Sequence, residues 1–200
     1  DVLDVIDIIT GIILAAGSSK RMGKQKLILP LKNSTIVENA VETVKSCKAF
    51  GEILVVYQSE EVMDRIKKYD VKTVYNAKAK DGQSTSVIEG IKNSDPDAKA
   101  YMFIAGDQPF ITKDIIEALI NAWKKNQNSI IVPCYDGKKG MPTIFPAEFR
   151  QELMNITGDT GGRTIIQGNS DRVMFVDFYD TMAGFDIDTP EEYNETLKII

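Results

Sequence analysis

Short, almost uninterrupted runs of apolar residues recur along the chain. The first covers residues 8–16, reads Ile-Ile-Thr-Gly-Ile-Ile-Leu-Ala-Ala and ends at Gly17. Runs of this length without polar alternation are typical of strands covered on both faces, as in a parallel sheet. Similar runs predict further strands at 53–57, 71–74, 101–105 and 129–132.

Amphipathic segments separate these runs. They predict helices at 34–48, 59–69, 84–92 and 112–125, where apolar residues recur at helical spacing. The last of these opens with Thr112, a good capping residue. Strands that alternate with helices indicate βαβ units, so we predict an α/β fold with a mostly parallel sheet.

The pattern loosens after residue 133, where glycine and proline become frequent. A strand that could run antiparallel is predicted at 141–145, and a final strand at 172–176. Short helices are predicted at 148–155 and 160–167, and another helix begins at Pro190. Because no linker interrupts the 200 residues, we expect a single domain over residues 1–200.

Composition narrows the chemistry. Hydrophobic residues make up 43% and charged residues 26%, which is an ordinary globular mixture, and the net charge of −5 argues against a nucleic-acid partner. Histidine is absent, so the commonest general base is missing. Cys47 and Cys134 match no metal-binding spacing. Any catalysis must therefore rely on carboxylates, lysine, arginine and a hard metal ion.

No secretory signal stands out, and no apolar run is long enough to cross a bilayer. We therefore expect a cytoplasmic protein with no membrane partner. We interpret both cysteines, and also Trp123, as packing residues.

The turn after the first apolar run is the first candidate site. It contains the small residues Ala15, Ala16, Gly17, Ser18 and Ser19, followed by Arg21 and Lys26. Ligands of open parallel sheets bind at the carboxyl ends of strands, where backbone N–H groups can hold phosphate. The basic side chains would then neutralise the phosphates. The residues alone leave open a plain strand-to-helix turn with solvated basic side chains.

Carboxylates at two other places could complete such a site. Asp107 follows the run at 101–105 directly, and Thr112 already supplies a cap for the next helix, which favours a metal ligand over a capping role. Asp186 and Asp188 lie two positions apart, so an extended segment would place both on one face. The alternative for this pair is that Asp188 or Thr189 caps the helix at Pro190.

A family resemblance adds to this interpretation. The stretch Leu14-Ala-Ala-Gly-Ser-Ser-Lys-Arg-Met-Gly-Lys-Gln-Lys-Leu27 closely resembles the signature Leu-Ala-Ala-Gly-x-Ser-x-Arg-Met-Gly-x-Pro-Lys-Leu of nucleotidyltransferases with a Rossmann-like sheet. One departure is Gln25 in place of proline, which suggests a more mobile loop ahead of Lys26. The segments Gly-Asp-Gln-Pro at 106–109 and Asp-Ile-Asp-Thr-Pro-Glu-Glu at 186–192 resemble further motifs of molybdenum cofactor nucleotidyltransferases, in the MobA-like NTP transferase family.

The resemblance implies a Rossmann-like three-layer nucleotidyltransferase fold with a small antiparallel elaboration in its second half. It also implies that the nucleotide binds in a half covering roughly residues 8–110 and the acceptor in roughly 111–200. The implied nucleotide-binding residues are Leu14, Ala15, Ala16, Gly17, Ser18, Ser19, Arg21, Lys26, Gly82, Ser84 and Asp107. The catalytic set would be Arg21, Lys26 and Asp107, and Mg²⁺ would be held by Asp107 with Asp188 and Asp186.

Acceptor residues follow from two more segments. Lys139-Gly-Met-Pro142 is similar to a Gly-x-Arg-Gly-His-Pro segment of cytidylyltransferases, which implies roles for Gly140 and Pro142, although Met141 replaces the histidine. Thr157-Gly-Asp-Thr-Gly-Gly-Arg163 resembles the Gly-Asp-x-Gly-Ala-Arg motif of the molybdenum cofactor branch, which implies roles for Asp159 and Arg163. The residues alone also allow a hairpin turn in the first segment. In the second they allow a helix start capped by Asp159 or Thr160.

The implied activity is transfer of CMP from CTP to the phosphate of molybdopterin, with pyrophosphate as the leaving group. Ala16, where the guanylyl branch more often has glycine, favours CTP. Three alternatives stay open: a guanylyltransferase of the same cofactor, a cytidylyltransferase for another phosphorylated small molecule, and a non-catalytic chaperone that binds the nucleotide or cofactor. The resemblance also suggests a molybdenum hydroxylase apo-enzyme as a partner.

Overall fold

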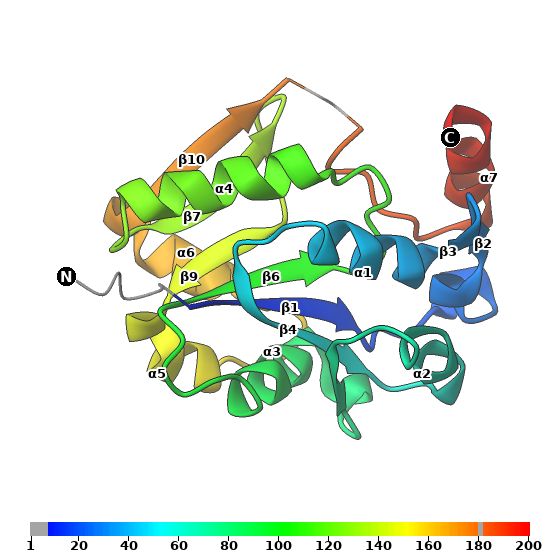
Figure 1. Ribbon diagram of the computed structural model, residues 1–200, viewed down its shortest axis with the longest axis horizontal. Helices are drawn as coiled ribbons and strands as arrows, with labels where there is room; N and C mark the ends of the chain where they lie inside the picture. Colours follow the sequence, from blue (N-terminus) through cyan, green and yellow to red (C-terminus); the bar gives the residue numbers. More distant parts are fainter. Residues whose placement is uncertain (1–7, 180–181) are drawn as a thin grey trace.

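The computed structural model describes residues 8–179 and 182–200. Within this part of the chain, an eight-stranded sheet has the order β10-β7-β9-β6-β1-β4-β5, and β8 pairs with β7 beside this path (Figure 1). The strands are β1 (Ile9–Ala15), β4 (Phe50–Tyr57), β5 (Lys72–Tyr75), β6 (Ala100–Ala105), β7 (Ile130–Tyr135), β8 (Lys138–Lys139), β9 (Thr143–Pro146) and β10 (Val173–Phe178).

Most neighbouring strands are parallel. β1 lies between β4 and β6, parallel to both, and β4 is parallel to β5. β9 is antiparallel to β6 and β7, while β10 is parallel to β7. The carboxyl ends of β1, β4, β5 and β6 therefore meet at one edge of the sheet. This topology confirms the predicted parallel sheet and the antiparallel strand in the second half.

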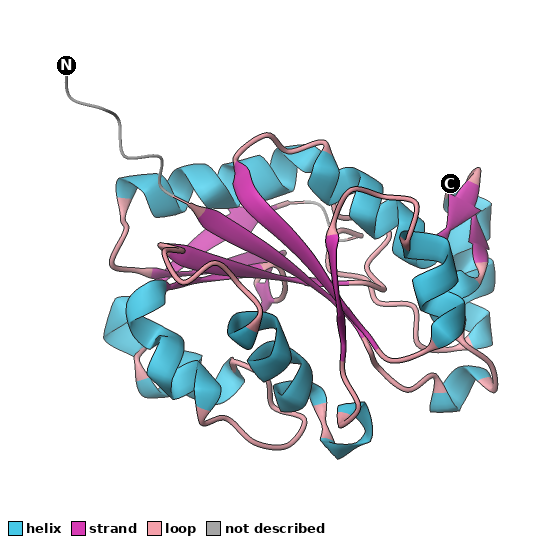
Figure 2. Ribbon diagram, turned by 60° about the horizontal axis from the view of Figure 1, so that its bottom comes forward, coloured by secondary structure: helices cyan, strands magenta, loops and turns pink. Residues whose placement is uncertain are grey.

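Helices cover both faces of the sheet, as Figure 2 shows. One layer contains α1 (Ile36–Lys45), α2 (Glu60–Ile66) and α4 (Lys113–Lys125), and the other contains α3 (Gln83–Lys92), α5 (Arg150–Met154) and α6 (Arg163–Gly168). Each layer packs its apolar face on the sheet and encloses a separate hydrophobic cluster. A further helix, α7 (Pro190–Ile199), lies near the hairpin of β2 (Pro30–Leu31) and β3 (Ser34–Thr35). There Tyr193 Oη donates a hydrogen bond to the Pro30 carbonyl.

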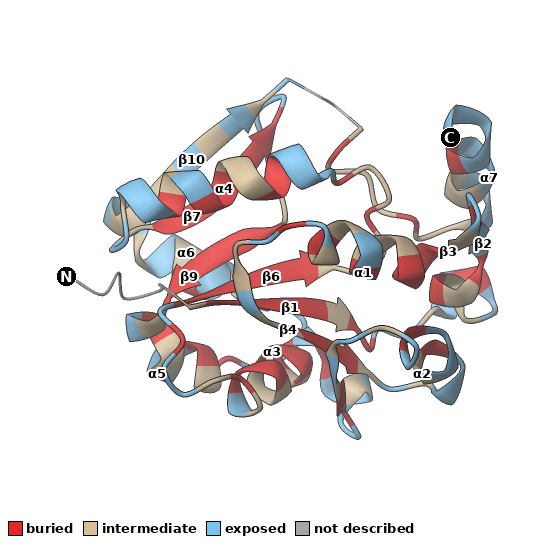
Figure 3. Ribbon diagram, viewed as in Figure 1, coloured by how far each residue is buried: buried red, intermediate tan, exposed pale blue. Residues whose placement is uncertain are grey.

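The alternation of side chains along β1 explains its continuous apolar sequence. Ile13 and Ala15 belong to the cluster under α1, α2 and α4, whereas Ile12 and Ala16 belong to the cluster under α3, α5 and α6. Because both faces are covered, every residue of β1 is buried except Leu14, which is partly exposed (Figure 3). The cysteines and Trp123 are buried too, as expected, and burial raises the pKa of both thiols.

Two predicted helices begin later than expected. The helix predicted at 34–48 begins at Ile36, because Ser34 and Thr35 pair with β2 and the Thr35 side chain caps α1. The helix predicted at 160–167 begins at Arg163, and no side chain caps it, so the alternative of a cap by Asp159 or Thr160 is wrong. Among the helices described, none is long and apolar enough to span a membrane.

Candidate functional site

Lys26 joins three segments that are far apart in the sequence. Its Nζ atom lies 2.7 Å from Oδ2 of Asp107 and 2.9 Å from Oδ1 of Asp188. Burial lowers the pKa of Lys26, but the charges and hydrogen bonds of the two carboxylates outweigh burial and raise the pKa above its ordinary value. Four segments were expected to converge at one edge of the sheet, namely residues 15–26, 82–86, 107 and 186–188. Lys26 joins three of them, and Gln83 and Ser86 from the fourth line the cavity described below.

The backbone holds these residues in place. Asp107 follows β6, and its carbonyl accepts a hydrogen bond from Ile187 N over 3.0 Å, which fixes the C-terminal segment against the sheet edge. The Thr189 side chain caps α7 through Glu192 N. Of the two capping alternatives, the cap is therefore Thr189, and the Asp188 carboxylate is left to pair with Lys26.

Gln25 ties the loop that carries Lys26. Its Oε1 atom accepts hydrogen bonds from Ser19 Oγ over 3.1 Å and from Leu27 N over 3.4 Å. Ser19 Oγ in turn accepts from Lys26 N over 3.0 Å. The glutamine therefore constrains this loop by hydrogen bonds where proline would constrain it by its ring, which argues against the expected gain in mobility.

Asp186 lies beside this cluster but faces another partner. Its Oδ1 atom accepts a hydrogen bond from Gln108 Nε2 over 2.8 Å. Burial, and then the nearby charge of Asp107, raise the pKa of Asp186 to about 6, although the Gln108 hydrogen bond opposes the rise. Asp186 and Asp188 flank the fully buried Ile187, which agrees with the expectation that they share one face.

A cavity of about 270 Å³ opens at this edge of the sheet. Its wall includes Lys26 and Asp107 together with Gly17 and Ser18 from the first turn. The complete lining is Leu14, Ala16, Gly17, Ser18, Lys20, Lys26, Leu27, Ala79, Lys80, Gln83, Ser86, Ala105, Asp107 and Asp159. We call this the sheet-edge cavity.

Three residues of the first turn that were expected to bind nucleotide lie outside its lining. Ala15 points to the opposite face of the sheet and packs in the core. The Ser19 hydroxyl accepts a hydrogen bond from the backbone N–H of Lys26. The Arg21 side chain is 72% exposed and forms an ion pair with Asp188 at 3.4 Å, so it stands at the outer margin of the cluster.

Gly82 and Ser84 connect the start of α3 to the 157–163 segment. A Cβ atom on Gly82, whose φ is +120°, would lie 2.4 Å from the Gly158 carbonyl oxygen, so only glycine fits. Ser84 N donates to the same carbonyl, and Gln83 N donates to Asp159 Oδ1. Gly82 and Ser84 thus have structural roles and do not line the cavity. The Asp159 carboxylate thus accepts the hydrogen bond of the first N–H group of α3, and Asp159 also lines the sheet-edge cavity.

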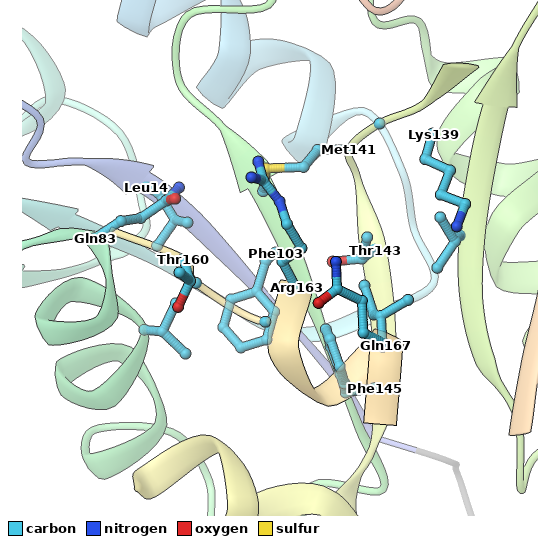
Figure 4. A pocket seen from close by; sticks show the side chains of 16 residues that line it. Leu14, Gln83, Phe103, Lys139, Met141, Thr143, Phe145, Thr160, Arg163 and Gln167 are labelled. Carbon is cyan, nitrogen blue, oxygen red and sulfur yellow. The ribbon is translucent and has the colours of Figure 1, made fainter. Parts of the chain in front are cut away.

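A second cavity, of about 260 Å³, adjoins the first and shares Leu14 and Gln83 with it. We call it the β9 cavity. Figure 4 shows its aromatic side chains Phe103 and Phe145 and its polar side chains, which include Arg163. Its complete lining is Leu14, Gln83, Val87, Phe103, Val132, Lys139, Gly140, Met141, Thr143, Phe145, Thr160, Gly161, Gly162, Arg163, Ile166 and Gln167.

The residues expected to bind an acceptor divide between the two cavities. Gly140 and Arg163 line the β9 cavity, Asp159 lines the sheet-edge cavity, and Pro142 lines neither. Asp136 and Gly137 have positive φ angles of 48° and 82°, so the predicted hairpin turn is present between β7 and β8. This hairpin leads into Gly140 at the cavity wall.

Sequence reasoning missed Gln83, Gln108 and the two lysines Lys20 and Lys80. Gln108 follows Asp107 directly and could have been found from its position after β6. Lys20 fills a variable position of the signature, and Lys80 lies in no recognised motif. Only the folded chain shows that both lysines line one cavity.

Within residues 8–179 and 182–200, no group of three or more aspartate, glutamate or cysteine side chains could hold a metal ion. The two carboxylates of Asp107 and Asp188 nevertheless converge on one cation, the Lys26 ammonium. Mg²⁺ is commonly held by one or two carboxylates together with substrate phosphates. The donor set therefore fits a divalent cation that arrives with a phosphate ligand.

Comparison with known proteins finds relatives that match nearly the whole chain. The chain is 28% identical to the probable molybdenum cofactor guanylyltransferase of Natranaerobius thermophilus, over 97% of both chains. It is 24% identical to the molybdenum cofactor cytidylyltransferase of Escherichia coli, over 91% of this chain and 92% of that one.

Among solved structures, the chain resembles a homologue of the Mycobacterium tuberculosis protein Rv0371c, from Mycobacterium sp. strain JC1. The TM-score is 0.84, with 26% identity over 96% of each chain. A family model described as the MobA-like NTP transferase domain matches residues 11–173, which is most of the sequence. The chain therefore belongs to the MobA-like NTP transferase family, a family of nucleotidyltransferases.

Proposed function

We propose that this protein transfers the CMP group of CTP to the phosphate of molybdopterin and releases pyrophosphate. The observation that carries the proposal is the cluster of Lys26, Asp107 and Asp188. Lys26 and Asp107 lie at the wall of one cavity that adjoins a second. One cavity can receive a nucleoside triphosphate and the other an acceptor. The reacting groups would then meet near Leu14 and Gln83, which both cavities share.

The nucleoside triphosphate is assigned to the sheet-edge cavity. Gly17 and Ser18 bring backbone groups to its wall at the end of β1, where open parallel sheets bind phosphate ligands. Lys26 and Arg21 lie where they can neutralise the negative charge of the leaving pyrophosphate. We expect Ser86 and Ala16, which also line this cavity, to contact the nucleoside.

The reaction joins an oxygen of the acceptor phosphate to the α-phosphorus of CTP. The bond between that phosphorus and the bridging oxygen breaks, and pyrophosphate leaves with the electron pair. Mg²⁺ bound by Asp107 and Asp188 would supply charge neutralisation at the reacting phosphates. The acceptor phosphate is already ionised and needs no strong general base, which suits a chain without histidine.

The acceptor is assigned to the β9 cavity. Its aromatic and aliphatic walls suit a planar ring system, and Arg163 supplies a cation for a phosphate group. Met141 stands where related cytidylyltransferases have histidine. A thioether accepts hydrogen bonds only weakly and donates none, so apolar contact replaces a hydrogen bond there.

The choice between CTP and GTP rests on a small difference. Ala16 lines the sheet-edge cavity, and its methyl group takes space that glycine would leave to a larger base. The relatives include proteins named for each nucleotide. One methyl group discriminates by only about 1–3 kcal/mol, so GTP transfer to the same cofactor is the second candidate.

A non-catalytic chaperone of the same fold is the alternative from another class. The retention of Lys26, Asp107 and Asp188 in one bonded cluster favours the enzyme. The test is pyrophosphate release with CTP or GTP, each with and without molybdopterin. Release that requires molybdopterin supports the transferase, and no release in any combination would leave the chaperone.

A further inference from the structure

Some of the charged side chains that line the sheet-edge cavity are paired within the protein, and others are not. Lys26 is bound by two carboxylates, so the cluster of Lys26, Asp107 and Asp188 carries a net negative charge. Lys20 and Lys80 also line the cavity, from the turn after β1 and from the segment between β5 and α3. In the described part of the chain neither ammonium takes part in a hydrogen bond or an ion pair. The ammonium groups of Lys20 and Lys80 are therefore the unpaired positive charges at the cavity wall.

The start of α3 does not supply an alternative anion site. Gln83 N donates to the Asp159 carboxylate over 3.1 Å, and Ser84 N donates to the Gly158 carbonyl over 3.0 Å. The N–H groups that could hold a phosphate at this helix end are therefore satisfied within the protein. The start of α3 therefore offers no free N–H group to a phosphate chain in the cavity.

The backbone beneath Lys80 is well fixed. Asn76, which is almost fully buried, accepts a hydrogen bond from Lys78 N over 3.0 Å and donates to Thr85 Oγ1 and Ser86 Oγ, each over 2.9 Å. Thr85 Oγ1 donates to the Lys78 carbonyl over 3.1 Å. This network joins the Lys80 segment to α3, so the lysine is held at the cavity while its ammonium stays unpaired.

We propose that Lys80 binds the phosphate chain of the nucleoside triphosphate, from a different loop than the Gly17–Lys20 turn. The inference rests on the proposed function only insofar as the sheet-edge cavity binds that nucleotide. The ligand class is a polyphosphate, because an ammonium on a flexible stem recognises negative charge and not the base. Lys80 therefore contributes to affinity for CTP and GTP alike.

Lys78 provides a matched control. It lies two residues away in the same segment, carries the same charge and is exposed, but it does not line the cavity. The variants are Lys80→Ala, Lys80→Arg and Lys78→Ala. Equilibrium binding of CTP, GTP and inorganic tripolyphosphate with Mg²⁺ is measured by titration calorimetry at low and high salt.

We expect Lys80→Ala to weaken all three ligands about fivefold to tenfold at low salt, because a charge-assisted contact at an exposed site is lost. The effect shrinks at high salt, Lys80→Arg restores most of the affinity, and Lys78→Ala changes it less than twofold. Equal affinities for Lys80→Ala and Lys78→Ala overturn the proposal, as does a wild-type protein that binds none of the ligands. Normal binding with an intact Lys80 effect but no pyrophosphate release overturns the transferase and leaves the role of Lys80 standing.

Discussion

The Nζ atom of Lys26 lies 2.9 Å from Oδ1 of Asp188, although 162 positions separate the two residues. The same ammonium bonds Asp107 at the end of β6. One cation thus joins the loop after β1, the end of β6 and the C-terminal segment. Without a metal ion, Lys26 is the group that keeps two carboxylates together.

Replacing Lys26 by methionine should therefore make stability depend on a divalent cation. The Lys26 side chain is only 12% exposed, and its loss leaves Asp107 without its ion pair and Asp188 with only the exposed Arg21 as a counter-charge. We expect a loss of about 1–3 kcal/mol in the free energy of unfolding when EDTA is present. Millimolar Mg²⁺ should restore more stability to the variant than to the wild type, as measured by urea denaturation.

The neighbouring exposed Lys24 supplies the control for that experiment. Lys24→Met should unfold like the wild type with and without Mg²⁺, because Lys24 takes part in no described ion pair. An unchanged response to Mg²⁺ in Lys26→Met would show that the two carboxylates do not share a cation site.

Replacing Asp107 by asparagine tests the same cluster through catalysis. The amide keeps the size of the side chain but removes the charge that a divalent cation needs. We expect pyrophosphate release to fall by at least about 100-fold, with a thermal unfolding midpoint close to that of the wild type. The control is Asp97→Asn at an exposed turn, which should retain normal turnover. Near-normal turnover of Asp107→Asn would remove Asp107 from the metal site.

Gly82 is predicted to be irreplaceable for packing reasons. In Gly82→Ala the new Cβ atom would lie 2.4 Å from the Gly158 oxygen at a φ of +120°. We expect a loss of about 2–5 kcal/mol in the free energy of unfolding, together with weaker nucleotide binding, since strain and overpacking add. Gly137→Ala separates the two effects, because its φ is +82° but nothing lies within 4 Å. A smaller loss in Gly82→Ala than in Gly137→Ala would contradict the account.

The strands and most helices could be predicted from the sequence, because apolar residues occupy the positions of each strand or helix that are buried against its neighbours. In β1 both faces are covered, and the run from Ile9 to Ala15 is nearly all apolar. The motif residues Lys26, Asp107 and Asp188 were also identified, because strand ends and family signatures mark them. The sequence could not show that Ala15 faces the opposite core, since a turn motif does not state which face each residue occupies.

Other contacts depend on segments that meet only after folding. Asp159 was expected in the acceptor region, but its carboxylate accepts a hydrogen bond from Gln83 N at the start of α3. The two residues lie 76 positions apart, so no local sequence pattern connects them. Lys80 lies outside every motif, and its place at the cavity follows from the position of its loop between β5 and α3. Contacts between loops of this kind require the three-dimensional arrangement.

Ionisation of Asp186 should lower the free energy of unfolding as the pH rises from about 4 to about 6. In the unfolded chain its carboxyl ionises near a pKa of about 4, whereas in the folded protein burial and Asp107 raise the pKa to about 6. Between these values the folded state binds more protons than the unfolded state, so this group's stabilising contribution declines as pH increases. Asp186→Asn should remove this decline. Urea midpoints from pH 4 to 7 check it, and an unchanged slope in the variant would contradict the assignment.

The measurement that tests the central claim most directly is the ratio of kcat/KM for CTP to that for GTP, with molybdopterin as acceptor and Mg²⁺ present. The account predicts pyrophosphate release only when molybdopterin is added and a ratio above one in favour of CTP. For Ala16→Gly it predicts a fall of at least about fivefold in that ratio, because one methyl group discriminates by about 1–3 kcal/mol. A preference for GTP would contradict the cytidylyl assignment, and no turnover with either nucleotide would contradict the transferase.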